Sequence, residues 1–175
     1  VKVKEGKPTH SVDNQDEIKK LFPNTYGLPL ISFEPGETML RKRVNVGVIL
    51  SGGQAPGGHN VFSGLFDRLK QLDPENRLYG FLMGPSGLVD HNYKEITADF
   101  VEQFRNTGGF DMIGSGRTKL EEVDQFEKGM EIIRKLDIQA LVIIGGDDSN
   151  TNACMLAEYY AAKKYGVQVI GCPAT

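Results

Sequence analysis

The stretch VNVGVILSGGQAPGGHN, residues 44–60, decides the fold class of this chain. Its first part, residues 44–50, is a short β-branched apolar run, which predicts a strand buried on both faces. The run stops at a loop that contains four glycines. Beyond the loop, leucine and phenylalanine recur at helical spacing and predict a helix over residues 59–72. The stretch is therefore a strand, a glycine loop and a helix in succession.

The same alternation continues to the end of the chain. The patterns predict a strand over 77–84, a loop over 85–92, helices near 97–106 and over 123–136, a buried strand over 140–146, a helix ending near 164 and a strand over 167–171. This order predicts an α/β domain with a mostly parallel, Rossmann-like sheet flanked by helices, whose ligands bind at the carboxyl ends of the strands. Residues 1–43 hold four prolines and are expected to form an irregular N-terminal extension with one short helix, which leaves 44–175 as the domain.

The composition excludes several classes of protein. The 175 residues carry a net charge of −3, with 39% hydrophobic and 25% charged residues and no long apolar run, which is typical of a globular chain and not of a membrane-spanning one. The charge offers no basic surface for nucleic acid or an anionic membrane. The two cysteines and three histidines have no zinc-ligand spacing. The polar N-terminus carries no secretion signal, so we expect a cytoplasmic protein.

Glycine is frequent, with 21 residues, and it gathers where the predicted strands end. Gly52, Gly53 and Gly57 follow the first strand, and Gly146 ends the strand over 140–146. Glycine lets an anion approach backbone N–H groups, and the N-terminus of a following helix attracts negative charge. Ordinary turn chemistry is the alternative. Because several such glycines share one expected sheet edge, we predict that they bind phosphate there.

This phosphate site is not a Walker or a dinucleotide site. The loop over 51–60 lacks the lysine and the hydroxyl residue of a P-loop, and no G-x-G-x-x-G follows a strand. A different set of charged residues must therefore hold the phosphate.

Three charged residues near the glycines predict a role in phosphoryl chemistry. Asp147 follows two glycines and is a candidate Mg²⁺ ligand, with helix capping as the alternative. Asp148 adds a second carboxylate, which repels a polyphosphate and restricts the donor that fits. Arg117, in GSGR, can form paired hydrogen bonds with phosphoryl oxygens, although a solvated surface arginine is the alternative.

The order and spacing of four segments resemble those of the pyrophosphate-dependent phosphofructokinases, especially the long type that includes the plant β subunit. The segments are SGGQAPGGHN (51–60), GGFDMIGSGR (108–117), GGDDSNTNA (145–153) and VIGCP (169–173). The segment SVDNQDEIKKLFPNTYGLPL (11–30) resembles the N-terminal lead-in of that family. The resemblance implies reversible, Mg²⁺-dependent transfer of a phosphoryl group from pyrophosphate to the 1-hydroxyl of fructose 6-phosphate, in cytoplasmic glycolysis and gluconeogenesis.

The resemblance also implies roles for single residues. Gly53 matches the pyrophosphate-contacting glycine, Arg117 the phosphoryl-binding arginine and Asp147 the magnesium-associated aspartate of the family. Asp148 matches the residue that replaces the glycine of ATP-using relatives and favours pyrophosphate. Thr175 matches the first residue of the sugar-phosphate segment.

The chain departs from the family pattern in two places. Ala174 stands where the family has the lysine of its PKTIDGD segment, so a cation that stabilises the transferring phosphoryl group is missing. The chain also stops at Thr175, before the segment with the catalytic-base aspartate and most of the acceptor site. We therefore expect it to be the donor half of a longer, oligomeric enzyme, and expect the 175 residues alone to be inactive.

Two other functions stay open at this point. Ala174 is compatible with a non-catalytic regulatory subunit that binds phosphate ligands without turnover. An ATP-dependent kinase with a GGDG-type turn is the second alternative, against which Asp148 argues.

Overall fold

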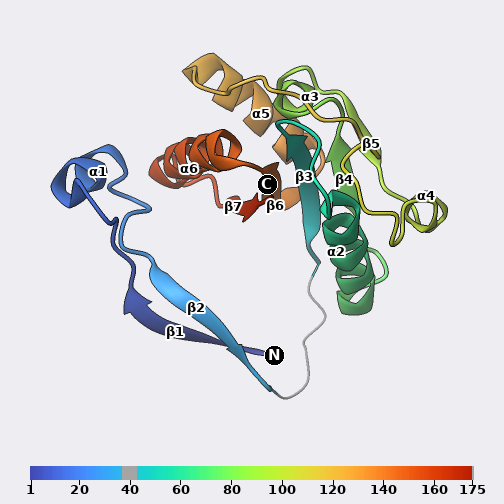
Figure 1. Cartoon of the computed structure of the whole chain (residues 1–175), viewed down its shortest axis with the longest axis horizontal. Helices are drawn as coiled ribbons and strands as arrows, with labels where there is room; N and C mark the ends of the chain where they lie inside the picture. Colours follow the sequence, from blue (N-terminus) through green and yellow to red (C-terminus); the bar gives the residue numbers. More distant parts are fainter. Residues whose placement is uncertain (37–42, 175) are drawn as a thin grey trace.

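A five-stranded sheet forms the centre of the structure, a computed structural model that describes residues 1–36 and 43–174 (Figure 1). Its strand order is β5-β4-β3-β6-β7, and all neighbours run parallel except β4 and β5. The elements are, in chain order, β1 (Lys2–Pro8), α1 (Gln15–Leu21), β2 (Pro29–Glu34), β3 (Asn45–Ser51), α2 (Gly58–Leu72), β4 (Leu78–Phe81), α3 (Pro85–Val89), β5 (Tyr93–Glu95), α4 (Ala98–Glu102), α5 (Val123–Lys135), β6 (Ile138–Gly145), α6 (Asp147–Ala162) and β7 (Gln168–Pro173). The predicted α/β fold with a mostly parallel sheet is confirmed.

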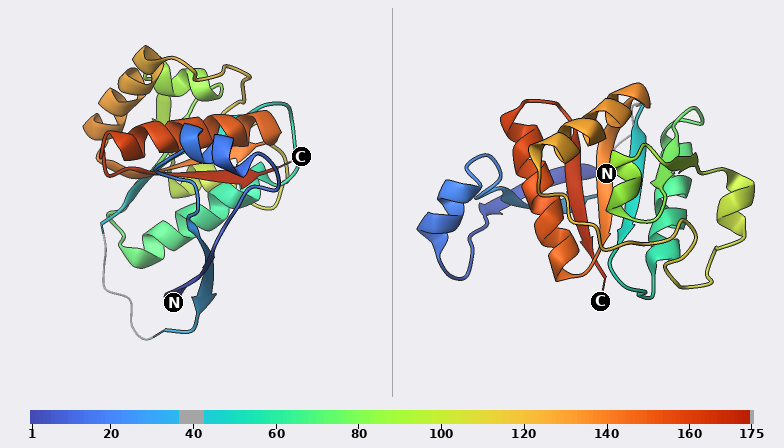
Figure 2. Two further views of the ribbon diagram at one scale, coloured as in Figure 1. Left: turned by 90° about the vertical axis from the view of Figure 1, so that its left-hand side faces the viewer. Right: turned by 90° about the horizontal axis from the view of Figure 1, so that it is seen from above.

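The sheet has an apolar layer on each face, because its central strands send alternate side chains to opposite sides. Ile49 of β3 packs with α3, α5 and α6, whereas Val48 and Leu50 pack with α2 and α4. In β6, Leu141 belongs to the first cluster and Val142 to the second. Figure 2 shows the two helical layers, with α3, α5 and α6 on one side of the sheet and α2 on the other. None of the helices in the described part of the chain is long and apolar enough to cross a membrane.

The carboxyl ends of three parallel strands meet at one edge of the sheet. The β3–β6 register runs from Val46 opposite Ala140 to Ser51 opposite Gly145, and Gly145 also pairs with Pro173 of β7. The chain leaves β3 towards β4 on one side and later returns to β6 on the other side. Such a reversal separates the two connecting loops and opens a crevice between them, where α/β proteins bind their ligands.

One segment predicted as a loop, residues 85–92, begins instead with a helix. Helix α3 starts at Pro85, directly after Gly84, whose φ of 86° turns the chain. Proline suits the first helical turn because that position needs no N–H donor. The edge strand β5 follows, and α4 ends at Glu102, earlier than the predicted helix near 97–106. These elements have three to five residues each, too few to show a periodic pattern in the sequence.

The N-terminal extension is more regular than predicted, because it contains an antiparallel ribbon of β1 and β2 beside the expected short helix α1. Val3 pairs with Phe33, and the ribbon extends away from the large sheet (Figure 1). The prolines Pro8 and Pro29, which led to the prediction, stand at the last residue of β1 and the first residue of β2. A strand tolerates a missing N–H at its ends. The division into residues 1–43 and 44–175 stays a prediction.

Helix α6 holds this extension through one carboxylate. Glu158 accepts hydrogen bonds from the backbone N–H groups of Asn24 and Thr25, at 3.1 and 3.0 Å, and also from both of their side chains. Burial disfavours the charged form of Glu158, but these hydrogen bonds outweigh burial and lower the pKa of the carboxyl below its ordinary 4.5. The stabilisation is therefore complete above about pH 4.5 and is lost as the pH falls through the lowered pKa.

We expect Glu158→Gln to release the extension from α6. The neutral amide is a weaker acceptor, and hydrogen bonds to a partly exposed charged group are worth about 1–2 kcal/mol, so proteolytic cleavage within the first 36 residues should rise about five- to thirtyfold. Limited proteolysis followed by mass spectrometry measures this rate. Glu34→Gln is the matched control, because its ion pair with Lys4 is exposed and of little weight. Equal cleavage of both variants, or an unchanged rate for the unsubstituted chain between about pH 6 and pH 3, contradicts this role of Glu158.

Candidate functional site

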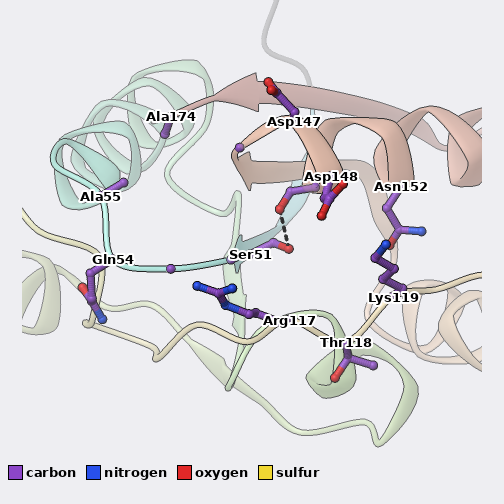
Figure 3. Close-up of a pocket in the computed structure, with 14 residues that line it drawn as sticks. Ser51, Gln54, Ala55, Arg117, Thr118, Lys119, Asp147, Asp148, Asn152 and Ala174 are labelled. Carbon is purple, nitrogen blue, oxygen red and sulfur yellow. Dashed lines mark hydrogen bonds between the residues drawn. The ribbon is translucent and has the colours of Figure 1, made fainter.

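A cavity of about 610 Å³ lies at the edge where the strands end. It is lined by residues from the β3–α2 loop, the segment before α5, the start of α6 and the end of β7: Ser51, Gly52, Gly53, Gln54, Ala55, Arg117, Thr118, Lys119, Gly146, Asp147, Asp148, Ser149, Asn152 and Ala174. The predicted location of the ligand site, at the carboxyl ends of the parallel strands, is therefore where the cavity is found (Figure 3).

The β3–α2 loop forms one wall of the cavity. Gly52 has a φ of 97°, which favours glycine, and its N–H donates to the carbonyl oxygen of Gly116 at 2.8 Å. A Cβ atom at Gly53 would lie 3.2 Å from Nη2 of Arg117. The glycine at position 53 thus lets the guanidinium group lie directly against the loop backbone.

The β6–α6 turn forms the opposite wall. A Cβ atom at Gly145 would lie 2.3 Å from the carbonyl oxygen of Ser51, so only glycine lets the two strand ends approach this closely. A buried hydrogen bond of 2.9 Å, from Ser149 Oγ to Ser51 Oγ, joins the same two loops (Figure 3). Gly146 is the N-cap residue of α6, and Asp147 and Asp148 occupy its first turn.

The start of α6 bears on the capping alternative for Asp147. The N-cap position belongs to Gly146 and carries no side-chain capping hydrogen bond, so Asp147 does not cap the helix. Both aspartate side chains are exposed, and neither makes a hydrogen bond or an ion pair with the described residues 1–36 and 43–174. In Figure 3 the carboxylate of Asp148 points towards the segment of Arg117, whereas that of Asp147 points away from it. The two carboxylates are available to a ligand from different directions.

The third wall is an extended segment, residues 116–120, that passes in front of the two loops. Gly116 forms an isolated parallel bridge with Ser51, and Leu120 is buried with its backbone paired to the side chain of Asn152. Arg117 and Lys119 are exposed between these two points, and neither side chain is paired within the described part of the chain. Two cations and two carboxylates therefore line the same cavity.

Most of the residues predicted to form the site come together here. The cavity is lined by Gly52, Gly53, Gly146, Asp147, Asp148, Arg117 and Ala174. Gly57 stands apart, because it is the N-cap residue of α2, with a φ of 93°, and does not line the cavity. Thr175 lies outside the described residues.

Lys119 and Asn152, which were not predicted from the sequence, also line the cavity. Lys119 stands two positions after Arg117, so the basic pair in GSGRTK was a usable signal. Asn152 gave no such signal, because its partner Leu120 is 32 positions away in the chain.

The donor set suits a metal that is shared with a phosphate ligand. No group of three or more histidine, cysteine, aspartate or glutamate side chains that could hold a metal occurs within residues 1–36 and 43–174. Mg²⁺ is usually held by one or two carboxylates together with substrate phosphate oxygens and water. Asp147 and Asp148 fit that pattern, since both are exposed and line the cavity.

Comparison with known proteins assigns the chain to a family. The phosphofructokinase family model matches residues 45–175. A pyrophosphate–fructose 6-phosphate 1-phosphotransferase of Porphyromonas gingivalis is 66% identical over 176 residues, which cover 100% of this chain and 32% of that protein. The subunit beta 1 of the enzyme of the same name from Arabidopsis thaliana is 49% identical, with 99% and 31% covered. The chain thus spans about a third of the length of these relatives.

Solved structures of low sequence identity share the fold. The phosphofructokinase of Pichia pastoris in the T-state is 22% identical, with a TM-score of 0.65 over 80% of this chain and 16% of that chain. A pyrophosphate-dependent phosphofructokinase from Nitrosospira multiformis is 20% identical, with a TM-score of 0.65 over 73% of this chain and 32% of that chain. Because the family model covers the whole sheet and the cavity, and the close relatives bear the name that the sequence motifs predicted, this chain belongs to the phosphofructokinase family and resembles its pyrophosphate-dependent members.

Proposed function

We propose that the chain is the donor-binding part of a longer pyrophosphate-dependent phosphofructokinase, called the full-length protein below. One observation carries the proposal: Arg117, Asp147 and Asp148 line a single cavity at the switch point of the sheet, and the carboxylate of Asp148 points towards the segment of Arg117. The names and the identity of the relatives add support. The reaction is transfer of a phosphoryl group from pyrophosphate to fructose 6-phosphate, which gives fructose 1,6-bisphosphate and phosphate.

Each wall of the cavity has a part in this reaction. The glycine loop with Gly52 and Gly53 and the N-terminus of α6 at Gly146 offer backbone N–H groups and a positive dipole end to the phosphates. Arg117 forms paired hydrogen bonds with phosphoryl oxygens and stabilises the charge that develops in the transition state. Asp147 would contribute a carboxylate oxygen to Mg²⁺, which when bound would neutralise negative charge on the donor.

The position of Asp148 also restricts the donor. It stands in the first turn of α6 with its carboxylate directed into the cavity (Figure 3). A nucleoside triphosphate needs room for a third phosphate and its substituent, and an anionic side chain at this place repels that phosphate. Pyrophosphate ends before such a clash arises. The site therefore favours pyrophosphate over ATP.

The remaining features of the enzyme concern the full-length protein. We expect Thr175 to take part in binding the sugar phosphate, and the catalytic base and most of the acceptor site to come from other segments of the full-length protein. We expect the full-length protein to work in the cytoplasm as a homodimer or other oligomer. The 175 residues alone are expected to show no turnover and at most weak binding of pyrophosphate with Mg²⁺.

A donor-exchange assay tests the proposal. The full-length protein is supplied with fructose 6-phosphate, Mg²⁺ and either pyrophosphate or ATP, and fructose 1,6-bisphosphate is measured. We expect product with pyrophosphate and a rate with ATP that is lower by at least about tenfold, since a misplaced charge near a phosphate costs more than 1.4 kcal/mol. A preference for ATP contradicts the proposal and favours an ATP-dependent kinase with a GGDG-type turn. Binding of pyrophosphate without product favours the regulatory subunit, for which Ala174 is the specific observation.

A further inference from the structure

We propose that Lys119 is a second anchor for the donor phosphates and that Asn152 is the positioning residue that holds it at the cavity. This inference rests on the proposed function, because it names a further binding residue of the same site. It is carried by the contacts that fix residues 116–120 beside the cavity.

The segment that carries Lys119 is fixed at both of its ends. At one end, Gly116 bridges to Ser51, and its carbonyl oxygen accepts the N–H of Gly52 at 2.8 Å. At the other end, the N–H of Leu120 donates to Oδ1 of Asn152 at 3.0 Å, and Nδ2 of Asn152 donates to the carbonyl oxygen of Leu120. Only three residues separate these anchors, so the backbone that carries Lys119 has little freedom to move.

The Asn152 contact is built as a clamp. Its amide pairs with both backbone groups of one residue, in the way that a neighbouring strand does, and the pair is buried, with Asn152 8% and Leu120 1% exposed. Breaking one side leaves a buried polar group without a partner, which is unfavourable. The contact therefore fixes residue 120 against α6.

The clamp also sets the position of Lys119 relative to the acidic side of the site. Asp148 and Asn152 stand four residues apart on α6, so they share one face of the helix. The face of α6 that presents the Asp148 carboxylate thus also binds Leu120, the residue next to Lys119. Figure 3 shows Lys119 beside Asn152, on the same side of the cavity as that helix.

The charge of Lys119 has no partner in the described part of the protein. Its side chain lines the cavity, is exposed, and takes part in no hydrogen bond or ion pair with residues 1–36 or 43–174. Among the described residues that line the cavity, the positive charges are those of Arg117 and Lys119. With Ala174 in place of a cation, Lys119 supplies the second positive charge that a diphosphate with its metal still requires.

Lysine variants of the full-length protein test the anchor. We expect Lys119→Met to raise the KM for pyrophosphate and to weaken calorimetric binding of pyrophosphate with Mg²⁺, each by about ten- to a hundredfold, because a charge-assisted contact is lost. The KM for fructose 6-phosphate should stay within about twofold. Lys119→Arg keeps the charge and should restore most of the affinity. Lys135→Met, at the exposed end of α5 and away from the cavity, is the matched control.

Asparagine variants test the clamp. Asn152→Asp keeps the size and the acceptor for the Leu120 N–H but loses the donor to its carbonyl oxygen, and Asn152→Ala loses both. We expect both variants to raise the KM for pyrophosphate, with smaller effects in a Lys119→Met background, because both residues act through one cation. Thermal unfolding verifies that each variant folds. If Asn152→Ala does not fold, the double-mutant cycle of Asn152→Asp with Lys119→Met tests the clamp instead.

The outcomes separate this inference from the proposed function. A full-length protein that neither binds nor uses pyrophosphate overturns both. A protein that uses pyrophosphate, but whose Lys119→Met variant keeps its KM for pyrophosphate or loses affinity for both substrates alike, overturns the anchor alone. Additive effects of the Asn152 and Lys119 variants leave the anchor standing and overturn the clamp.

Discussion

Arg117→Met in the full-length protein is expected to lower the rate of pyrophosphate-dependent turnover by about 100- to 1,000-fold, the usual loss when one electrostatic contact to a developing charge is removed. The guanidinium group lies against the β3–α2 loop, where a Cβ atom at Gly53 would be 3.2 Å from Nη2. It carries no competing partner within the described residues. All five of its donors are therefore available to phosphoryl oxygens.

The rate constant kcat and the KM for pyrophosphate, measured by steady-state kinetics, check this expectation. Arg117→Lys keeps the charge but loses the paired geometry, so it should fall between the methionine variant and the unsubstituted protein. Arg134→Met is the control. Arg134 belongs to α5, lies over the ring of Tyr165 and does not line the cavity. If Arg117→Met keeps the full rate, Arg117 has no part in the mechanism and is a solvated surface arginine.

The central part of the fold could be predicted because its sequence pattern is redundant. The strands β3 and β6 are largely apolar runs; β3 is followed directly by two glycines and β6 ends at Gly145. Helices α2, α5 and α6 have 13 to 16 residues each, enough to show an apolar stripe or a clear end. The small elements α3 and β5 could not be predicted, since their pairing depends on neighbours that the sequence does not identify. The ribbon of β1 and β2 was hidden by the prolines at its strand ends.

The candidate site shows the same division between local and distant signals. Asp147 and Asp148 follow directly after a glycine pair, so local sequence was enough to predict them. Of the glycines predicted to bind phosphate, Gly52, Gly53 and Gly146 line the cavity, whereas Gly57 does not. Gly116 lies next to the cavity-lining Arg117, but a Cβ atom at position 116 would lie 2.3 Å from the carbonyl oxygen of Met83. Glycine is therefore needed at this position for close packing of the backbone. The role of Asn152 depends on a contact across the fold, which a single sequence does not reveal.

The end of β7 bears on whether the protein is a catalyst at all. The N–H of Ala174 donates to the carbonyl oxygen of Gly145 at 2.8 Å, so the backbone at this position is fixed beside the β6–α6 turn. Its side chain lines the cavity on the same side as Ala55 (Figure 3). Ala174 is half-buried against the apolar layer on the α2 side of the sheet and also lines the cavity, so we expect a longer side chain at position 174 to extend into the cavity.

Ala174→Lys in the full-length protein is expected to raise the rate of phosphoryl transfer from pyrophosphate by about 100- to 1,000-fold, because an ammonium group at this place stabilises the transferring phosphoryl group. The fixed backbone means that the new side chain enters the cavity without rearrangement of β7. Ala174→Met, of similar length and without charge, separates the charge from the bulk and should leave the rate unchanged within about threefold, since it adds only apolar contact. The measurement is kcat with saturating pyrophosphate and fructose 6-phosphate.

A large gain in rate for Ala174→Lys alone identifies a catalyst that lacks one cation. An unchanged rate for both variants, with pyrophosphate still bound, identifies instead a subunit that binds the donor without using it, since a restored cation cannot accelerate a reaction for which the other groups are absent.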